Sequence, residues 1–159
     1  MSCNKYLPHV FVLPEDDANR QLANGFVLTL PRSIQVLEEV GGWNEVWKRF
    51  LADHVTEMEL YPHRSMVLLI DFDGDEDRLR LVNDRIPEHL RGRVYVLGSL
   101  SEPEDLRADL GSPETIGLAL ARDCRENTDR TWGHRLLRHN AGELQRLREN
   151  VRPFLFPLL

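Results

Sequence analysis

The feature that most constrains how this chain can fold is the stretch 65–75, where an apolar run leads directly into alternating carboxylates. Residues 66–70 are uninterrupted apolar side chains, typical of a strand that is buried on both faces. Asp71, Asp73 and Asp75 follow at alternate positions. Because a strand turns alternate side chains to the same side, we expect Asp71 and Asp73 to face one point at the strand's carboxyl end. An acidic turn after a core strand is the alternative interpretation.

Other segments of the chain alternate between strand and helix character. Strands are expected at 9–13, 32–40, 65–70 and 93–98, and helices at 18–24, 43–57, 76–85, 113–127 and 132–151, with a further helix capped by Ser101. Such alternation is typical of a parallel sheet covered on both faces and joined by right-handed crossovers. We therefore predict an α/β fold: a parallel four-stranded, Rossmann-like sheet with helices on both faces and a helical C-terminal extension.

Acidic clusters follow three of the four expected strands, at 15–17, 71–75 and 102–105. The carboxyl ends of parallel strands lie on one edge of the sheet, and ligands of open α/β sheets bind at that edge. Asp16 or Asp17 can cap the following helix, which leaves Glu15 without a structural role. Crowded carboxylates repel one another, and their hard oxygen atoms suit Mg²⁺ or Mn²⁺. The three clusters therefore predict a metal site at this edge.

Composition limits the class of protein. With 159 residues, 42% of them hydrophobic and 29% charged, the chain suits one globular domain spanning 1–159. No apolar run approaches the roughly 20 residues that cross a bilayer, and the N-terminus lacks the apolar core of a signal peptide. Cys3 and Cys124 have no metal-type spacing. We expect reduced thiols in a cytoplasmic protein that has no membrane contact.

The net charge of −6 conceals a local excess of arginine, because residues 122–152 hold eight arginines against five acidic residues. Arg135 and Arg138 could line a path for phosphate groups if the last helix packs near the sheet edge. A solvated helix face is the alternative. His134 and His139 are five residues apart and do not share a helix face, so we expect surface or capping roles for them.

The order of these motifs resembles the Toprim catalytic domain found in primases, topoisomerases and OLD-family nucleases. That family has a glutamate after the first strand, matched here by Glu15, and an Asp-x-Asp motif after the third, matched by residues 71–73. Asp16 stands where the family usually has glycine. Nuclease branches add an acidic residue after the next strand, and Glu102 or Glu104 resembles it.

The Toprim resemblance covers residues 8–110 and leaves 111–159 as C-terminal helices with an apolar tail. It implies Mg²⁺-dependent or Mn²⁺-dependent phosphodiester cleavage of DNA or RNA. The implied catalytic residues are Glu15, Asp71 and Asp73, and the implied metal ligands are these three with Asp75, Glu102 and Glu104. Because the acidic surface gives no independent affinity for nucleic acid, we expect a protein partner to supply it. A non-catalytic interaction module with the same fold is the alternative.

A second resemblance is to haloacid-dehalogenase-type phosphatases, whose apolar strand ends in Asp-x-Asp-Gly, as residues 70–74 do here. It implies that Asp71 is a nucleophile, that Asp73 is the acid/base and that Ser99 binds phosphate. In that family the motif lies near the start of the chain, whereas 70 residues precede Asp71 here. The family's later lysine has no counterpart, because no lysine follows Lys48.

Overall fold

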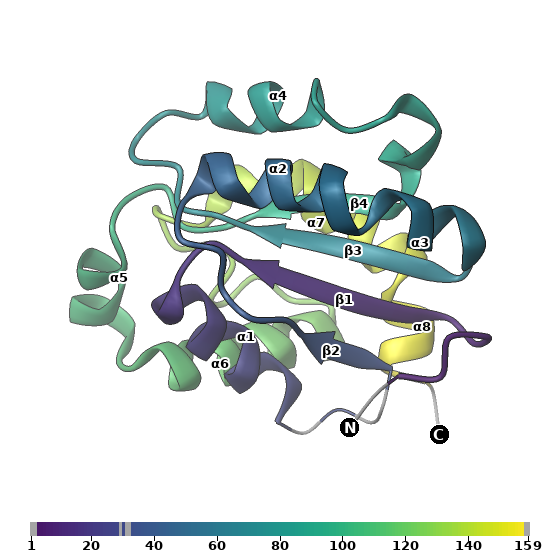
Figure 1. Cartoon of the computed structure of the whole chain (residues 1–159). Coiled ribbons are helices and arrows are strands. Elements are labelled where there is room, and N and C mark those ends of the chain that lie inside the picture. The colour runs from purple at the N-terminus through teal and green to yellow at the C-terminus, as the bar shows by residue number, and fades with distance from the viewer. Residues whose placement is uncertain (1–2, 29, 31–32, 158–159) are drawn as a thin grey trace.

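Four parallel strands form the centre of the computed structural model, which describes residues 3–28, 30 and 33–157 (Figure 1). The strands are β1 (His9–Pro14), β2 (Ile34–Val36), β3 (Arg64–Leu69) and β4 (Val94–Leu97). Their order across the sheet is β2-β1-β3-β4. The predicted parallel α/β architecture is confirmed, and β1 and β3 are parallel neighbours within it. Their carboxyl ends therefore meet at the middle of one sheet edge.

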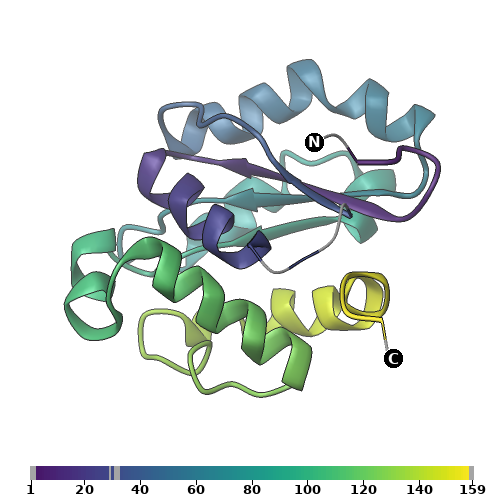
Figure 2. The same cartoon turned by 90° about the horizontal axis from the view of Figure 1, so that it is seen from below.

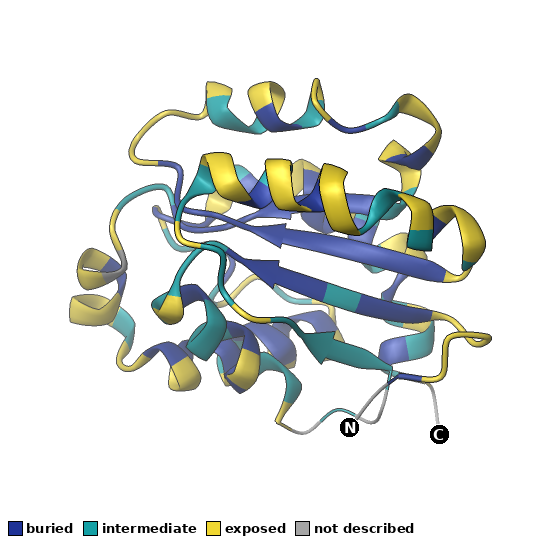
Figure 3. Ribbon diagram, viewed as in Figure 1, coloured by how far each residue is buried: buried dark blue, intermediate teal, exposed yellow. Residues whose placement is uncertain are grey.

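Strand side chains alternate between two hydrophobic cores, one on each face of the sheet. In β3, Val67 and Leu69 enter one core, whereas Met66 and Leu68 enter the other. All six residues of this strand are buried, and residues 66–69 within it form a continuous apolar run rather than an alternating one (Figure 3). The burial of both faces requires helices on both sides.

Helices supply those two layers (Figures 1 and 2). The elements that pack into the core on the Met66 side are α2 (Trp43–Asp53), α3 (Val55–Leu60), α4 (Asp77–Asn83) and the 3₁₀ helix η1 (Glu88–Arg93). The elements on the Val67 side are α1 (Asp17–Val27), α5 (Pro103–Leu110), α6 (Pro113–Glu126), α7 (Ala141–Asn150) and α8 (Arg152–Leu155), with the 3₁₀ helix η2 (Arg138–Asn140) before α7. None of the helices in the described ranges combines the length and apolar character that a membrane crossing requires.

Helices α1 and α6 lie side by side beneath the sheet and approach closely through two glycines (Figure 2). The first helix, predicted at 18–24 with Gly25 just after its end, is longer, since α1 continues through Gly25 to Val27. A Cβ atom on Gly25 would overlap the backbone of Glu114, and one on Gly117 would overlap the carbonyl oxygen of Leu22. Gly25 thus serves interhelical packing rather than helix termination.

The second predicted strand was too long, because only Ile34–Val36 of the range 32–40 pairs with β1; residues 31 and 32 lie outside the described part of the chain. After β2 the chain crosses the end of β1, where the Gly41 amide donates to the carbonyl oxygen of Glu15 at 2.8 Å. This crossing ends the strand ladder and brings the 41–42 turn to the carboxyl edge. The helix predicted at 43–57 is also interrupted, at His54.

The helix predicted at 132–151 begins only at Ala141, because residues 128–137 form a loop organised by Asp123. The Asp123 carboxylate is 2% exposed and accepts four hydrogen bonds, from the Thr128 hydroxyl and from the backbone amides of Arg130, Thr131 and Trp132. Burial alone would raise the pKa of Asp123, but these hydrogen bonds outweigh it and hold the pKa below its ordinary value. The loop is therefore a defined structure.

Side chains from the C-terminal region satisfy the open edge of β4. Glu143 accepts from the amide of Val96 at 2.9 Å, and Asn140 bonds both the amide and the carbonyl of Gly98 at 3.1 and 3.0 Å. These bonds cover backbone groups that an edge strand would otherwise leave open. The apolar tail packs onto the core, with Leu155 buried; residues 158 and 159 lie outside the described part.

Candidate functional site

Glu15 and Asp71 meet where β1 and β3 end. The backbone amide of Glu15 continues the sheet ladder to the carbonyl oxygen of Leu69 at 2.9 Å, which fixes the residue beside β3. Its carboxylate then accepts the backbone N–H of Asp71, with 2.6 Å between Oε2 and N. The predicted proximity of these two acids is therefore confirmed.

Asp16 and Asn19, at the start of α1, complete the cluster. Asp16 is the N-cap, and its Oδ1 accepts the amide of Asn19 at 2.9 Å. The buried Asn19 side chain donates from Nδ2 to Oδ1 of Asp71 at 3.2 Å. One carboxylate oxygen from each of Glu15, Asp16 and Asp71 lies within 4.8 Å of the other two. Two neighbouring strands thus bring three acids to one point.

The crowding changes how these acids ionise. Burial raises the pKa of Asp71 to about 8, and the negative charges of Asp16 and Glu15 contribute to the rise. The Asn19 hydrogen bond acts in the opposite direction. Burial also raises the pKa of Glu15, although the hydrogen bond from the Asp71 amide partly offsets it. The cluster therefore retains a proton near neutral pH.

Asp73 does not join the three clustered carboxylates, contrary to the expectation that it shares a face with Asp71. Strand β3 ends at Leu69, and Asp73 adopts a positive φ of 50°, so the alternation of side chains no longer applies at Asp73. Its side chain is 55% exposed, and its Oδ2 accepts from Arg78 Nη1 at 3.1 Å. The same Arg78 nitrogen donates to the carbonyl oxygen of Asp71 at 2.8 Å. Asp73 still lies close enough to contribute to the raised pKa of Glu15.

The remaining predicted metal ligands, Asp75, Glu102 and Glu104, are exposed and lie outside the three-carboxylate cluster. Asp75 Oδ1 accepts the amide of Asp77 at 3.0 Å at the start of α4. Glu102 is the N-cap residue of α5. These acids lie at the starts of helices and are exposed to solvent. Among the described residues, no contact joins their side chains to Asp71.

Ser99, two residues after the end of β4, is a further polar group at this edge. It is 6% exposed, and its hydroxyl has no hydrogen-bond partner among the described residues. Ser99 lines a cavity of about 20 Å³ together with Asp71, Asn19 and Arg107. That space holds about one water molecule or one oxygen atom of a larger ligand. Ser99 and Arg107 thus line the cavity beside Asp71, and both residue types can donate hydrogen bonds to an anionic oxygen.

The two arginines predicted to bind substrate lie away from this cavity. Arg135 is 64% exposed and lies 3.9 Å from Asp109, to which His134 also bonds at 2.8 Å. Arg138 lines a separate groove. His139 packs edge-on against Phe72, with ring centroids 4.7 Å apart, which keeps this segment beside the end of β3. A substrate-binding role for the two arginines stays a prediction.

Sequence reasoning identified Asp16 only as a helix cap and did not identify Asn19. The cap assignment is correct, but a cap occupies one carboxylate oxygen and leaves the other for Asp71. The run of acids after the first strand was the available signal. Neither a scan of protein-family models nor searches of curated proteins and solved structures find a match for this chain. The function must therefore be argued from the geometry alone.

Proposed function

We propose that this protein is a divalent-cation-dependent enzyme that cleaves phosphodiester bonds in nucleic acid, with Glu15, Asp16 and Asp71 holding Mg²⁺ or Mn²⁺. The observation that carries the proposal is the convergence of these three carboxylates at the carboxyl edge of a parallel sheet. The donor set fits such a cation, because all three groups offer hard oxygen atoms and excess negative charge.

A bound divalent cation would neutralise negative charge that develops on the phosphoryl group. The residues of the chain would bind and orient the substrate. The Ser99 hydroxyl and the Arg107 guanidinium, which line the cavity beside Asp71, can donate hydrogen bonds to phosphoryl oxygens. Glu15 holds the Asp71 backbone through one oxygen, which leaves its other oxygen to bind the cation.

Cleavage of labelled single-stranded and double-stranded DNA and RNA in Mn²⁺ or Mg²⁺ tests the proposal, both with the protein alone and with products of neighbouring genes. Glu15→Gln and Asp71→Asn should each abolish cleavage while the protein stays folded. Asp75→Asn is the matched control, because it removes one carboxylate of the same chain that lies outside the cluster.

Full cleavage by Glu15→Gln would refute the assigned site. If the protein binds metal but cleaves no nucleic acid under any condition, the non-catalytic interaction module becomes the better interpretation. Calorimetric titration with Mn²⁺ separates these outcomes, because it measures the metal site without requiring turnover.

Phosphomonoester hydrolysis is the second candidate, favoured by the position of Ser99 and Arg107 beside Asp71. An Asp71 oxygen would attack phosphorus, and the ester P–O bond would break to release an alcohol, which takes its proton from water. Water would then cleave the acyl phosphate, releasing inorganic phosphate and restoring the carboxylate. Borohydride treatment during turnover of p-nitrophenyl phosphate would convert Asp71 to homoserine in this mechanism and leave it unchanged in the first.

A further inference from the structure

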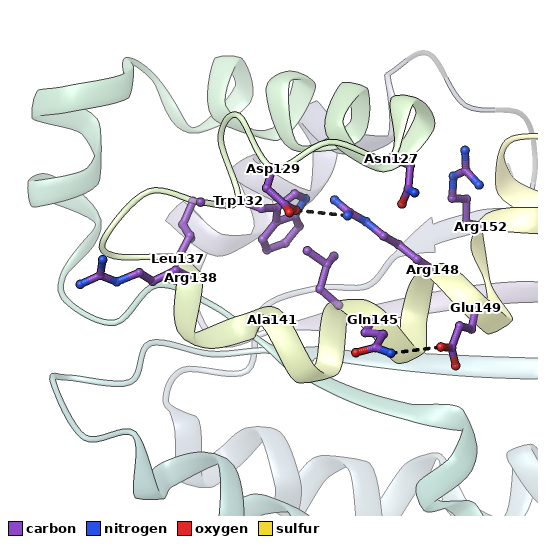
Figure 4. Close-up of a pocket in the computed structure, with 12 residues that line it drawn as sticks. Asn127, Asp129, Trp132, Leu137, Arg138, Ala141, Gln145, Arg148, Glu149 and Arg152 are labelled. Carbon is purple, nitrogen blue, oxygen red and sulfur yellow. Dashed lines mark hydrogen bonds and ion pairs between the residues drawn. The ribbon is translucent and has the colours of Figure 1, made fainter.

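Arg78 of α4 lies beside the acidic cluster, and its contacts differ from those of arginines that only hold the fold together. Arg148, for example, joins α7 to the loop after α6 through Asp129 at 3.1 Å and the carbonyl oxygen of Thr128 at 2.6 Å (Figure 4). Among the described residues, no clustered carboxylate lines the groove beside that loop. Arg78 instead contacts Asp71 itself, and the mechanism outlined above gives it no function.

Two hydrogen bonds fix the Arg78 guanidinium at the end of β3. Its Nη1 donates to the carbonyl oxygen of Asp71 at 2.8 Å and to Oδ2 of Asp73 at 3.1 Å. The backbone N–H of the same Asp71 donates to the Glu15 carboxylate at 2.6 Å. Arg78 and Glu15 therefore contact one and the same residue of the strand end, which places a cationic group next to the three clustered acids.

The indole ring of Trp43 supports the guanidinium from α2. The Arg78 Cζ lies 4.3 Å from the centre of that ring, within the range of a cation–π contact. Helix α2 begins at Trp43, directly after the 41–42 turn, whose amides donate to the carbonyl oxygen of Glu15 at 2.8 and 3.3 Å. The crossing that brings the chain to the carboxyl edge thus also brings Trp43 to Arg78. A guanidinium held in this way loses little freedom when it binds a ligand.

Part of the Arg78 guanidinium remains available to a ligand. An arginine offers five N–H donors in a planar fork. Within the described part of the chain, both side-chain bonds of Arg78 use Nη1, and neither Nε nor Nη2 has a protein acceptor. The side chain is only 12% exposed, so solvent screens its charge poorly. A fixed and partly desolvated fork of this kind suits a phosphoryl oxygen.

Arg78 and the Ser99 cavity approach the acidic cluster from opposite layers of the molecule. Helices α2 and α4 cover the Met66 side of the sheet, whereas the cavity is lined from α1, α5 and α6 on the other side (Figures 1 and 2). The Ser99 hydroxyl, 6% exposed and without a partner among the described residues, lines that cavity with Asp71. A phosphate at the carboxyl edge would therefore meet donors from both layers, with the carboxylates between them.

We propose that Arg78 is a further catalytic residue of the site, whose guanidinium contacts a nonbridging oxygen of the phosphate and stabilises the negative charge that develops during cleavage. Trp43 is a positioning residue that orients Arg78. Asp73 serves the site by bonding Arg78 instead of the metal ion, which gives the second aspartate of the Asp-x-Asp motif a role that its distance from the cluster allows. This inference rests on the proposed function.

Two calorimetric titrations test the role of Arg78 without requiring turnover. Mn²⁺ is titrated first, and thymidine 3′,5′-bisphosphate is then titrated into the Mn²⁺-loaded protein. Arg78→Gln should tighten Mn²⁺ binding about threefold or more, because a like charge is removed from beside the cation. The same substitution should weaken nucleotide binding at least about tenfold, because a charged hydrogen bond to phosphate is lost. A displaced strand end would weaken both affinities, so the opposite shifts identify a phosphate contact.

Three further variants complete the test. Arg80→Gln, the matched control, removes an exposed arginine of the same helix and should leave both affinities within about twofold of the wild type. Arg78→Lys keeps the charge but not the fork, so Mn²⁺ affinity should stay at the wild-type value while nucleotide binding weakens. Trp43→Leu removes the ring that orients the guanidinium and should weaken nucleotide binding but not Mn²⁺ binding.

Mn²⁺ binding that is unchanged or weaker in Arg78→Gln would overturn the proposal, and so would nucleotide binding that does not change. A wild type that binds Mn²⁺ but no nucleotide would overturn it as well. Cleavage assays on the same proteins separate this result from the proposed function. Opposite shifts in a protein that cleaves no nucleic acid would support the phosphate contact and count against cleavage, whereas a wild type that binds no Mn²⁺ would refute both.

Discussion

Replacing Asp71 with asparagine should stabilise the metal-free protein at neutral pH. The buried Asp71 carboxyl has its pKa raised to about 8 from an ordinary value of 3.8, chiefly by burial and then by Asp16 and Glu15. Between those values the folded protein retains a proton that the unfolded chain has released. The contribution of this carboxyl to the free energy of unfolding is therefore full below pH 3.8. It falls as the pH rises and is lost once the pH passes about 8.

The expected magnitude follows from that linkage. Each pH unit within the range lowers the free energy of unfolding by at most about 1.4 kcal/mol, so the loss between pH 5 and pH 7 reaches about 3 kcal/mol. Asparagine at position 71 cannot ionise. It retains an oxygen acceptor for Asn19 and gains an amide that can donate to Asp16, so the variant should avoid this loss.

Urea unfolding of the wild type and Asp71→Asn in EDTA, at several pH values from 5 to 8, measures the effect. Burial lowers the pKa of His9, His54 and His139, and these groups titrate in part of the same range with the opposite sign. The quantity to compare is therefore the difference between the two proteins, which should grow with pH in favour of the variant. Asp75→Asn, at an exposed position, controls for the general loss of a negative charge.

Saturating Mg²⁺ should narrow this difference, because it binds the folded wild type and adds about 2.7 kcal/mol at a hundred times its dissociation constant. A difference between wild type and Asp71→Asn that is independent of pH would refute the reasoning. So would a variant that is less stable than the wild type at pH 7 in EDTA.

Three other predictions concern the framework, each measured by urea or thermal unfolding. Asp123→Asn should destabilise the protein by about 2 kcal/mol at pH 7, because a charged acceptor of four hydrogen bonds is lost. Since the pKa of Asp123 is lowered, this difference should disappear as the pH falls below 3.8; a difference unchanged at low pH would contradict the cause given. Gly98→Ala should cost about 3 kcal/mol or more and weaken metal binding, because a Cβ would overlap the carbonyl oxygen of Ile70 beside the site. Gly117→Ala should cost about 2 kcal/mol by separating α6 from Leu22 of α1, and an unchanged melting temperature would contradict that close packing.

The sheet was predictable from the sequence because the central strand has a distinctive pattern. Residues 66–70 are buried on both faces, and a continuous apolar run between turn signals has few other interpretations. Helix–strand alternation then determines the parallel arrangement, and the arrangement brings Glu15 to Asp71. Helix boundaries were less predictable. Glycine often follows the last residue of a helix, but Gly25 lies within α1 and allows close packing against α6. That helix lies about 90 residues further along the chain.

The membership of the site was only partly predictable, because two of its properties are not local. Asp73 was expected beside Asp71 from strand periodicity, which fails once the backbone enters a left-handed turn. Asp16 has an adequate local explanation as a cap, and its second role appears only when β1 and β3 are known to be neighbours. No pattern around Ser99 indicates that its hydroxyl would be buried without a partner.

Glu15 links the fold to the candidate site, and this determines which substitution can test function. Its backbone joins β3 through Leu69 and receives the Gly41 amide, while its carboxylate holds the amide of Asp71. Alanine at position 15 would leave that amide unpaired at a cost of about 1–3 kcal/mol, so lost activity could reflect a displaced strand end. Glutamine keeps an acceptor oxygen for the same amide and removes only the charge. Loss of metal-dependent cleavage in Glu15→Gln, with unfolding unchanged, would therefore report on the charge of the cluster rather than on the architecture that holds it.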